Sequence, residues 1–266
     1  MTTTKRTHMG WELRESGPAN AEHVVLLLPG GMCSCEFYED IMSEPVLASH
    51  RLIAATVPGM GRTAAPPDVT VENYAALGGK LAADLGCDVV VGHSMGANIA
   101  LEMAAAKTFS GPIVLLSPSY SAEDEEKFFR VLANIARVPL IGPVLWSVAL
   151  KGMPGSMKKK FSEARRDALV ADLKNNDPGY TRRSVREYFD YLHRHGEVAS
   201  RLCGSGVKAW TVRGADDEVA VQPEERKTLE ACPTVTWVEE PEGTHMLLVE
   251  HPDRVAKVIA EAVAAA

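Results

Sequence analysis

The sequence has no excess of positive charge. Its 28 lysines and arginines are outnumbered by 35 aspartates and glutamates, which gives a formal net charge of -7 at pH 7. A protein that binds the phosphate backbone of nucleic acids needs a positive surface field. We therefore expect no nucleic-acid partner.

Cysteines at disulfide or metal-binding spacing are also absent. The five cysteines are an odd number and form neither a C-x-x-C pair nor a second cluster with zinc-ligand spacing. They are Cys33, Cys35, Cys87, Cys203 and Cys232. We interpret them as reduced thiols in a reducing compartment, so we expect a cytoplasmic protein without a bound metal ion.

Long apolar runs are missing as well. Residues 1–15 lack the run of about 7 to 15 apolar residues that a secretion signal needs. The most apolar stretches are Val24–Leu28 and Val138–Leu150, both shorter than the ~20 residues that cross a bilayer. The sequence therefore predicts neither secretion nor a membrane span.

What the sequence contains is an alternation of short apolar runs with amphipathic segments. Its 266 residues suit one large domain, and 46% of them are hydrophobic. Strands are predicted at Trp11–Glu15, Val24–Leu28, Leu52–Val57, Asp88–Val91, Ile113–Leu116, Lys208–Val212 and Val235–Val238. Helices are predicted at Val71–Leu85, Asn98–Lys107, Pro223–Cys232 and Pro252–Ala265. This order predicts an α/β fold with a mostly parallel central sheet flanked by helices.

One stretch, from Ser119 to about Ser200, breaks this alternation because it has helical patterns and prolines but no convincing strand. We interpret it as a helical insertion that covers a site like a lid. Its large apolar residues are able either to pack within the insertion or to contact a ligand. The substrate-binding residues predicted in it are Phe128, Leu132, Leu145 and Trp146. The lysines at positions 158–160 are expected to face solvent.

The strongest motif is Gly92-His93-Ser94-Met95-Gly96, which lies between a predicted strand and a predicted helix. A turn that holds a serine on a strained backbone needs small neighbours two residues to either side. This geometry exposes the serine hydroxyl and directs a helix N-terminus at it. The string alone is a weak signal, but its context predicts Ser94 as a nucleophile, with an ordinary glycine-rich turn and a capping serine as the alternative.

A serine nucleophile needs a base within hydrogen-bonding reach and an acid that orients the base. Of the eight histidines, His245 has the most favourable position, between the last predicted strand and the final predicted helix. Loops of this kind gather at the carboxyl end of a parallel sheet. For the acid, the loop after the strand predicted at 208–212 offers Asp216, Asp217 and Glu218.

The developing oxyanion needs hydrogen-bond donors. The predicted strand that begins at Val24 ends in Gly30 and Gly31, and glycines allow backbone N–H groups to approach a substrate oxygen. We predict the N–H of Met95 as one donor and that of Gly31 or Met32 as the other, with a plain two-glycine turn as the alternative. Met246, next to the predicted base, is expected to contact the substrate.

Together these residues resemble the α/β-hydrolase fold superfamily over nearly the whole chain. Ser94, Asp217 and His245 follow the family's chain order of elbow serine, acid and histidine. The resemblance favours Asp217 because members commonly have a glycine, two residues and then the acid, as from Gly214 to Asp217. It also implies a hydrolase core at residues 1–118 and 201–266 and a helical cap, or lid, at residues 119–200.

Two segments depart from the family pattern. Val57–Thr63 is similar to the family's D-x-x-G-x-G-x-S turn, but it has Thr63 in place of serine and no acidic residue at its start. Pro29-Gly30 stands where many members have His-Gly, which leaves the choice between the two second oxyanion donors open. The nucleophile is serine and not aspartate, which argues against haloalkane dehalogenase and epoxide hydrolase chemistry.

The sequence thus predicts a soluble serine hydrolase that uses no cofactor. We expect it to cleave a carboxylic ester, or a related acyl bond, of a medium-sized apolar small molecule through an acyl-enzyme intermediate. Hydrolysis of a thioester, a lactone or a carbon–carbon bond beside a ketone is open with the same three residues. A ligand-sensing protein with slow turnover is the alternative from another class.

Overall fold

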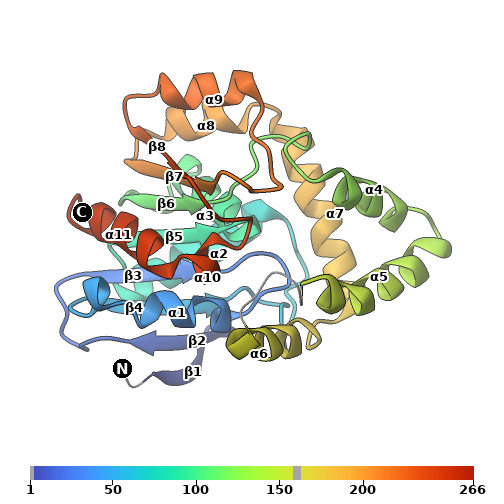
Figure 1. The fold of residues 1–266 in the computed structure, drawn as a ribbon, viewed down its shortest axis with the longest axis horizontal. Coiled ribbons are helices and arrows are strands. Elements are labelled where there is room, and N and C mark those ends of the chain that lie inside the picture. Colours follow the sequence, from blue (N-terminus) through green and yellow to red (C-terminus); the bar gives the residue numbers. More distant parts are fainter. Residues whose placement is uncertain (1–2, 158–162) are drawn as a thin grey trace.

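The computed structural model describes residues 3–157 and 163–266, so the lysines at 158–160 lie outside the described residues. The chain forms an eight-stranded sheet in the order β1-β2-β4-β3-β5-β6-β7-β8 (Figure 1). β1 pairs antiparallel with β2, and β2 pairs antiparallel with β4. The other six strands, β3 to β8, run parallel to one another. The sheet is therefore the mostly parallel one that the sequence predicts.

The elements have the following bounds. The strands are β1 Thr4–His8, β2 Trp11–Ser16, β3 Val24–Leu28, β4 Arg51–Thr56, β5 Val89–His93, β6 Ile113–Leu116, β7 Ala209–Gly214 and β8 Val235–Glu240. The helices of the sheet layers are η1 Cys35–Tyr38, α1 Glu39–Met42, η2 Pro45–Leu47, α2 Val71–Leu85, α3 Met95–Ala105, α8 Val198–Ser205, α9 Pro223–Glu230, α10 Leu247–Glu250 and α11 Pro252–Val263. Between β6 and α8 lie α4 Lys127–Ala136, α5 Ile141–Met157, α6 Glu163–Leu173 and α7 Pro178–His195.

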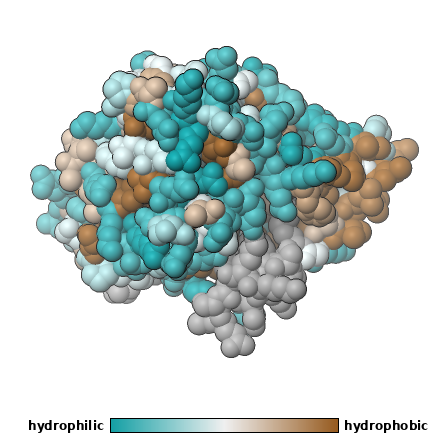
Figure 2. Space-filling model, turned by 45° about the horizontal axis from the view of Figure 1, so that its top comes forward, coloured by the Kyte–Doolittle hydropathy of each residue, from teal (hydrophilic) through white to brown (hydrophobic). Residues whose placement is uncertain are grey.

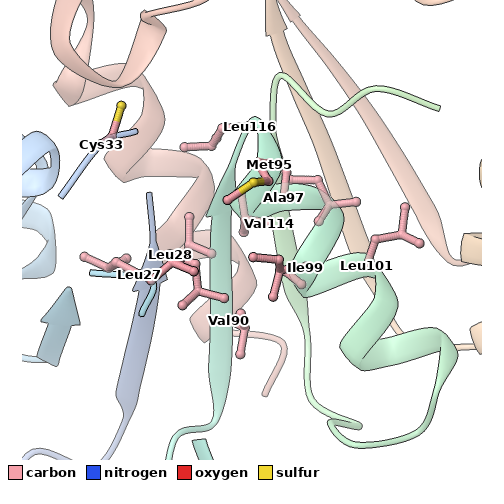
Figure 3. Packing of buried hydrophobic residues seen from close by; sticks show 14 of the residues in the cluster. Leu27, Leu28, Cys33, Val90, Met95, Ala97, Ile99, Leu101, Val114 and Leu116 are labelled. Carbon is pink, nitrogen blue, oxygen red and sulfur yellow. The ribbon is translucent and has the colours of Figure 1, made fainter. Parts of the chain in front are cut away.

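The centre of the sheet is buried on both faces. All residues of β6 and Val89–Val91 of β5 are buried, and these runs consist of valine, isoleucine and leucine. Figure 3 shows Leu27, Val90 and Val114 of three adjacent strands, and Ile99 of α3, among the buried residues of this core. Parallel strands covered on both sides read as continuous apolar runs, which is why the sequence predicts them well.

Helices cover both faces of this sheet (Figure 1). α3 packs against β5 and β6 and also contacts α2 and α8, whereas α11 packs against β5, β6 and β7 and contacts α1 and α10. Burial of their apolar sides holds these layers together. β1 has exposed polar residues and pairs only with β2, so no apolar pattern marks it in the sequence.

In the part that the structure describes, the segment between β6 and β7 contains helices joined by loops and no strand. α8 packs beside the sheet, against α3 and α9. α4, α5, α6 and α7, which we call the cap helices, extend beyond the sheet on the side where β5 ends (Figure 1). None of the helices in the described residues has the length and apolarity that crossing a membrane requires.

Candidate active site

The turn between β5 and α3 holds Ser94 in an unusual backbone conformation. Its φ is 51° and its ψ is -123°, and φ values in this range are uncommon for residues with a side chain. The Ser94 N–H donates to Leu116 O at 2.8 Å, which fixes the turn to the neighbouring strand. The strained residue sits at the N-terminus of α3, as the G-x-S-x-G motif predicts.

Close backbone contacts explain the two glycines of the motif. A Cβ atom on Gly92 would lie 2.2 Å from Gly96 O, and one on Gly96 would lie 2.3 Å from Leu28 O. Neither position has room for a side chain because the obstructing atoms belong to the backbone. The spacing of the motif is therefore a steric requirement of this turn.

The predicted base and acid lie in contact. His245 follows β8 and precedes α10, and its Nδ1 lies 3.1 Å from Asp217 Oδ1 in the loop after β7. The same carboxylate oxygen accepts the Val219 N–H at 2.9 Å. Asp217 is buried whereas Asp216 is exposed, so the geometry favours Asp217, the residue that the family resemblance indicates.

Asp217 and His245 shift each other's pKa in the directions that stabilise a carboxylate beside an imidazolium. Burial opposes the charge on Asp217, but the hydrogen bond and the positive charge of His245 outweigh it and lower the pKa of the carboxyl. Burial likewise disfavours the His245 cation, yet Asp217 and the more distant Glu125 and Glu218 raise the pKa of the imidazole above 6.5. His245 is thus a stronger base than a free histidine.

His93, which directly precedes the nucleophile, contacts the loop of the base. Its Nε2 lies 2.8 Å from His245 O, and because a carbonyl oxygen only accepts, Nε2 carries the proton. Burial lowers the pKa of His93 to about 3, so the ring is neutral near pH 7. The sequence gives this residue no role, since only the fold brings positions 93 and 245 together.

Two backbone N–H groups at the serine are free to meet an oxyanion. Neither the Met95 N–H in the first turn of α3 nor the Gly31 N–H donates a hydrogen bond to another described residue. The Met32 N–H instead points to Met60 Sδ at 3.3 Å. The structure therefore favours Gly31 over Met32 for the second donor, a choice that the sequence leaves open.

Ser94 and His245 line one cavity of about 270 Å³. Gly31, Met32 and Met95 line it as well, and so do three of the predicted substrate-binding residues: Phe128, Leu132 and Met246. Its other walls are Gly30, Cys33, His93, Glu125, Glu126, Phe129, Leu173, Val185, Tyr188, Glu218 and Val219. The cavity lies at the carboxyl ends of the parallel strands, where ligands of such sheets bind.

Leu145 and Trp146 do not line this cavity, which corrects their assignment as substrate contacts. The Trp146 side chain is 1% exposed, and its indole N–H donates to Thr181 Oγ1 at 3.0 Å, so it joins α5 to α7. Leu145 is 42% exposed on the outside of α5. Apolar composition identifies these helices but not the face that each residue occupies.

A larger, open cleft of about 600 Å³ lies at the other end of the strands. It is lined mainly by residues that precede β5, β6 and β7, such as Asp88, Pro112 and Lys208. It contains none of the predicted site residues, so we assign no chemistry to it. Among the described residues, no group of three or more potential ligands is arranged to hold a metal ion.

The thiols of Cys33, Cys35 and Cys87 are poor candidates for chemistry. All five cysteines are free, as expected for reduced thiols. Burial raises the pKa of Cys35 to about 11 and that of Cys87 to about 12, and it also raises the pKa of Cys33 at the cavity. Because the thiolate is the reactive form, these side chains are inert near neutral pH.

Asn176, between α6 and α7, joins the cap helices to the loop of the oxyanion donor. Its Nδ2 donates to Met32 O at 2.7 Å and to Leu173 O at 2.9 Å, and its Oδ1 accepts the Gly61 N–H at 2.9 Å. Gly61 lies in the turn at residues 57–63 that the sequence singles out. Sequence reasoning gives Asn176 no role, because its partners are far away along the chain.

These features agree with the comparison with known families. The chain belongs to the alpha/beta hydrolase family, whose sequence model matches residues 25–258. No curated protein matches the chain. The fold and the family are thus established, and the choice of substrate is left to the residues of the site.

Solved structures with different activities share this fold. A thermophilic esterase from Thermogutta terrifontis is 19% identical with a TM-score of 0.70, covering 99% of this chain and 98% of that chain. A thioesterase domain from the curacin biosynthetic pathway is 18% identical with a TM-score of 0.71, covering 97% and 99%. Haloalkane dehalogenase DbeA from Bradyrhizobium elkani is 20% identical with a TM-score of 0.75, covering 100% and 99%. At such identities the likeness shows the fold alone.

Proposed function

We propose that this hydrolase cleaves a carboxylic ester of a small, largely apolar molecule through an acyl-enzyme intermediate. The observation that carries the proposal is the joint placement of Ser94, on its strained turn, and the Asp217–His245 pair at one cavity. This arrangement provides a nucleophile, a base and an acid that orients the base.

In the proposed reaction, Ser94 Oγ attacks the ester carbonyl while His245 Nε2 accepts the hydroxyl proton. Asp217 holds Nδ1 and stabilises the imidazolium, and the N–H groups of Met95 and Gly31 bind the oxyanion. Collapse of the tetrahedral intermediate breaks the bond to the alcohol, which takes the proton from His245. A water molecule, deprotonated by His245, then attacks the acyl-enzyme and releases the carboxylic acid and free Ser94.

The size and lining of the cavity support a small ester. At about 270 Å³ the space lies just below the ~300 to 1,000 Å³ of sites for drug-sized ligands. Phe128, Leu132 and Met246 provide apolar surface for an acyl chain or an alcohol. We infer that the four cap helices form the lid over this space, as the resemblance implies.

The nucleophile favours acyl transfer over the dehalogenase activity of one structural neighbour. Displacement of halide from an alkyl carbon forms an ester with a carboxylate nucleophile, which water then hydrolyses. Ser94 would form an ether instead, which water does not cleave readily. Thioester, lactone and carbon–carbon bond hydrolysis are compatible with the same residues, and a substrate panel separates them from ester hydrolysis.

The proposal is tested by labelling and turnover. A fluorophosphonate probe is expected to modify the wild-type protein at Ser94, as read by peptide mass spectrometry, and to leave Ser94→Ala unlabelled. An acyl-length series of chromogenic esters is expected to show turnover that Ser94→Ala lacks. Labelling at another residue, or equal turnover by Ser94→Ala, would contradict the mechanism.

The acid is tested by a matched pair of neighbours. Asp217→Asn is expected to lower kcat for the best ester by about a thousandfold or more, because the imidazole loses its orienting charge. Asp216→Asn, with the same chemical change on an exposed side chain, is expected to leave kcat within about threefold of wild type. Equal losses in the two variants would remove Asp217 from the mechanism.

A further inference from the structure

Glu125 places a buried carboxylate in the wall of the cavity. Its residue surface is 7% exposed, although it lies only two residues before α4. Ser119 Oγ and Tyr188 Oη donate to the same oxygen, Oε1, at 2.6 Å and 2.8 Å. Oε2 accepts no hydrogen bond from another described residue, and among these residues no cation forms an ion pair with Glu125.

The position of this carboxylate is fixed relative to the nucleophile. Ser119 exchanges two hydrogen bonds with Asn98, whose Nδ2 donates to Ser119 O at 2.7 Å and whose Oδ1 accepts the Ser119 N–H at 3.3 Å. Asn98 lies one turn after Ser94 on α3. Glu125 is therefore held by the same helix that begins at the nucleophile.

A purely structural role does not explain why position 125 has a carboxyl group. The two hydroxyl donors would be accepted equally well by the amide oxygen of a glutamine, which costs far less to bury than a carboxylate. A buried charge without a cation is stable only where something offsets its desolvation. The His245 imidazolium offsets it when the base is protonated, and a cationic group that enters with the ligand would do so while the ester is bound.

The remaining cavity residues point to the same kind of ligand. Glu126 and Glu218 also line the cavity, and none of the described residues in its walls is a lysine or arginine. Phe128, Phe129 and Tyr188 line the same cavity as Glu125. Aromatic faces combined with carboxylates attract ammonium groups, because both present negative charge to the cation.

We propose that the cavity selects substrates that carry an ammonium or quaternary ammonium group, and that Glu125 is the specificity-determining residue. This inference rests on the proposed ester hydrolysis. A substrate with a carboxylate or phosphate at the same place is rejected, because it would face three carboxylates in a confined space.

Isosteric esters test this selectivity. The first pair is the 4-nitrophenyl ester of 4-(trimethylammonio)butanoate and that of 5,5-dimethylhexanoate, which differ only in N⁺ against C. The second pair, acetylcholine and 3,3-dimethylbutyl acetate, moves the cation to the alcohol and is followed by pH-stat. We expect kcat/KM of the cationic ester to exceed that of its neutral partner by about tenfold or more in at least one pair.

Two glutamine variants assign the effect. Glu125→Gln keeps an acceptor for Ser119 and Tyr188, and we expect the ratio of cationic to neutral kcat/KM to fall to about one. Glu123→Gln changes an exposed residue of the same segment outside the cavity and is expected to keep the wild-type ratio. The ratio is measured within each variant, so a general loss of activity cancels.

The outcomes separate this inference from the proposed function. Equal or better hydrolysis of the neutral ester in both pairs, or a ratio unchanged in Glu125→Gln, overturns the selectivity while ester hydrolysis stands. If neither type of ester is hydrolysed, the proposed function fails. Calorimetric binding of the four esters to Ser94→Ala then decides the selectivity alone: tighter binding of the cations supports it, and equal binding refutes it.

Discussion

The cap helices fall into two pairs that meet their surroundings in opposite ways. The pair α6–α7 is fastened to the sheet domain by polar groups: Arg165 donates to Glu39, Asp40 and Glu36 O, and Tyr180 Oη donates to Pro58 O. The pair α4–α5 turns a continuous apolar surface outward. Hydrogen bonds and ion pairs fix the position of α6–α7 relative to the sheet, whereas the exposed apolar face of α4–α5 makes no contact with other described residues that would fix these helices.

The outward face of α4–α5 is large. Leu140 is 91% exposed, and Val144 and Val148 are each more than 60% exposed. Figure 2 shows this surface as the brown patch at the right edge of the molecule. The pair α6–α7 therefore positions the site through the bonds of Asn176 to Met32 and Gly61, whereas α4–α5 contributes through its inner face.

The largest expected effect comes from breaking the fastened pair at Asn176. Asn176→Ala leaves the Gly61 N–H and the Met32 carbonyl without partners, so we expect unfolding in urea to show a loss of about 2 to 4 kcal/mol. We also expect kcat/KM for the best ester to fall about tenfold or more, because the oxyanion loop shifts. Both quantities are measured on the same preparation.

Asn175→Ala is the matched control. Asn175 Oδ1 accepts only an exposed bond from Arg62 at 3.1 Å, so we expect stability within about 0.5 kcal/mol of wild type. If the two asparagines gave the same loss of stability, the contrast between fastened and unfastened parts of the cap would not hold.

An intermediate effect, on the pH dependence of activity, is expected for Glu125, which lies just before α4 and acts on the pKa of His245. His245 must be neutral to accept the proton of Ser94, and its pKa lies above 6.5, so kcat/KM falls as the pH drops through that raised pKa and is full above it. Because Glu125 helps to raise this pKa, Glu125→Gln is expected to move the acid limb to lower pH. The pH profile of kcat/KM for a neutral ester measures the shift.

Glu123→Gln again serves as the reference for this profile. An acid limb that stays in place in Glu125→Gln, or that moves to higher pH, would show that the carboxylate does not act on the base. The pair α4–α5 would then contribute to the site only by lining the cavity.

The smallest effect is expected on the outward face. Replacing Val144 and Val148 together by serine removes apolar side chains that are 61% and 64% exposed, so we expect the free energy of unfolding to change by no more than about 0.5 kcal/mol per site. Trp146→Phe on the inner face of the same helix loses the bond to Thr181 and is expected to cost about 1 kcal/mol. A concentration-dependent loss in the serine variant would mean that this face is covered in solution.

The sequence predicts the sheet and the elbow because both depend on local patterns. Val24–Leu28, Ile113–Leu116 and Val71–Leu85 have the bounds that their apolar periodicity predicts. Gly92 and Gly96 mark the elbow because each meets a backbone atom that excludes any side chain. The local sequence is sufficient to predict these strands, this helix and this turn.

The surroundings of the site are not predictable in this way. Asn176, Glu125 and His93 gain their roles from partners more than sixty residues away, or from the face on which the fold places them. For the same reason Trp146, an apolar lid residue in the sequence, packs α5 against α7 instead of facing the cavity. Chain order suggests Ser94, Asp217 and His245, but not the groups that hold or tune them.

The bond from His93 to the backbone of His245 has a consequence for the proposed reaction cycle. His93 is bonded covalently to Ser94 and holds the loop of His245 by a hydrogen bond. A shift of either Ser94 or His245 therefore moves the other in the same direction. Since the His93 ring is already neutral near pH 7, with a pKa of about 3, it keeps the same hydrogen bond whichever way protons move between serine, base and leaving group. The distance between Ser94 and His245 therefore does not depend on the proton transfers of the proposed reaction.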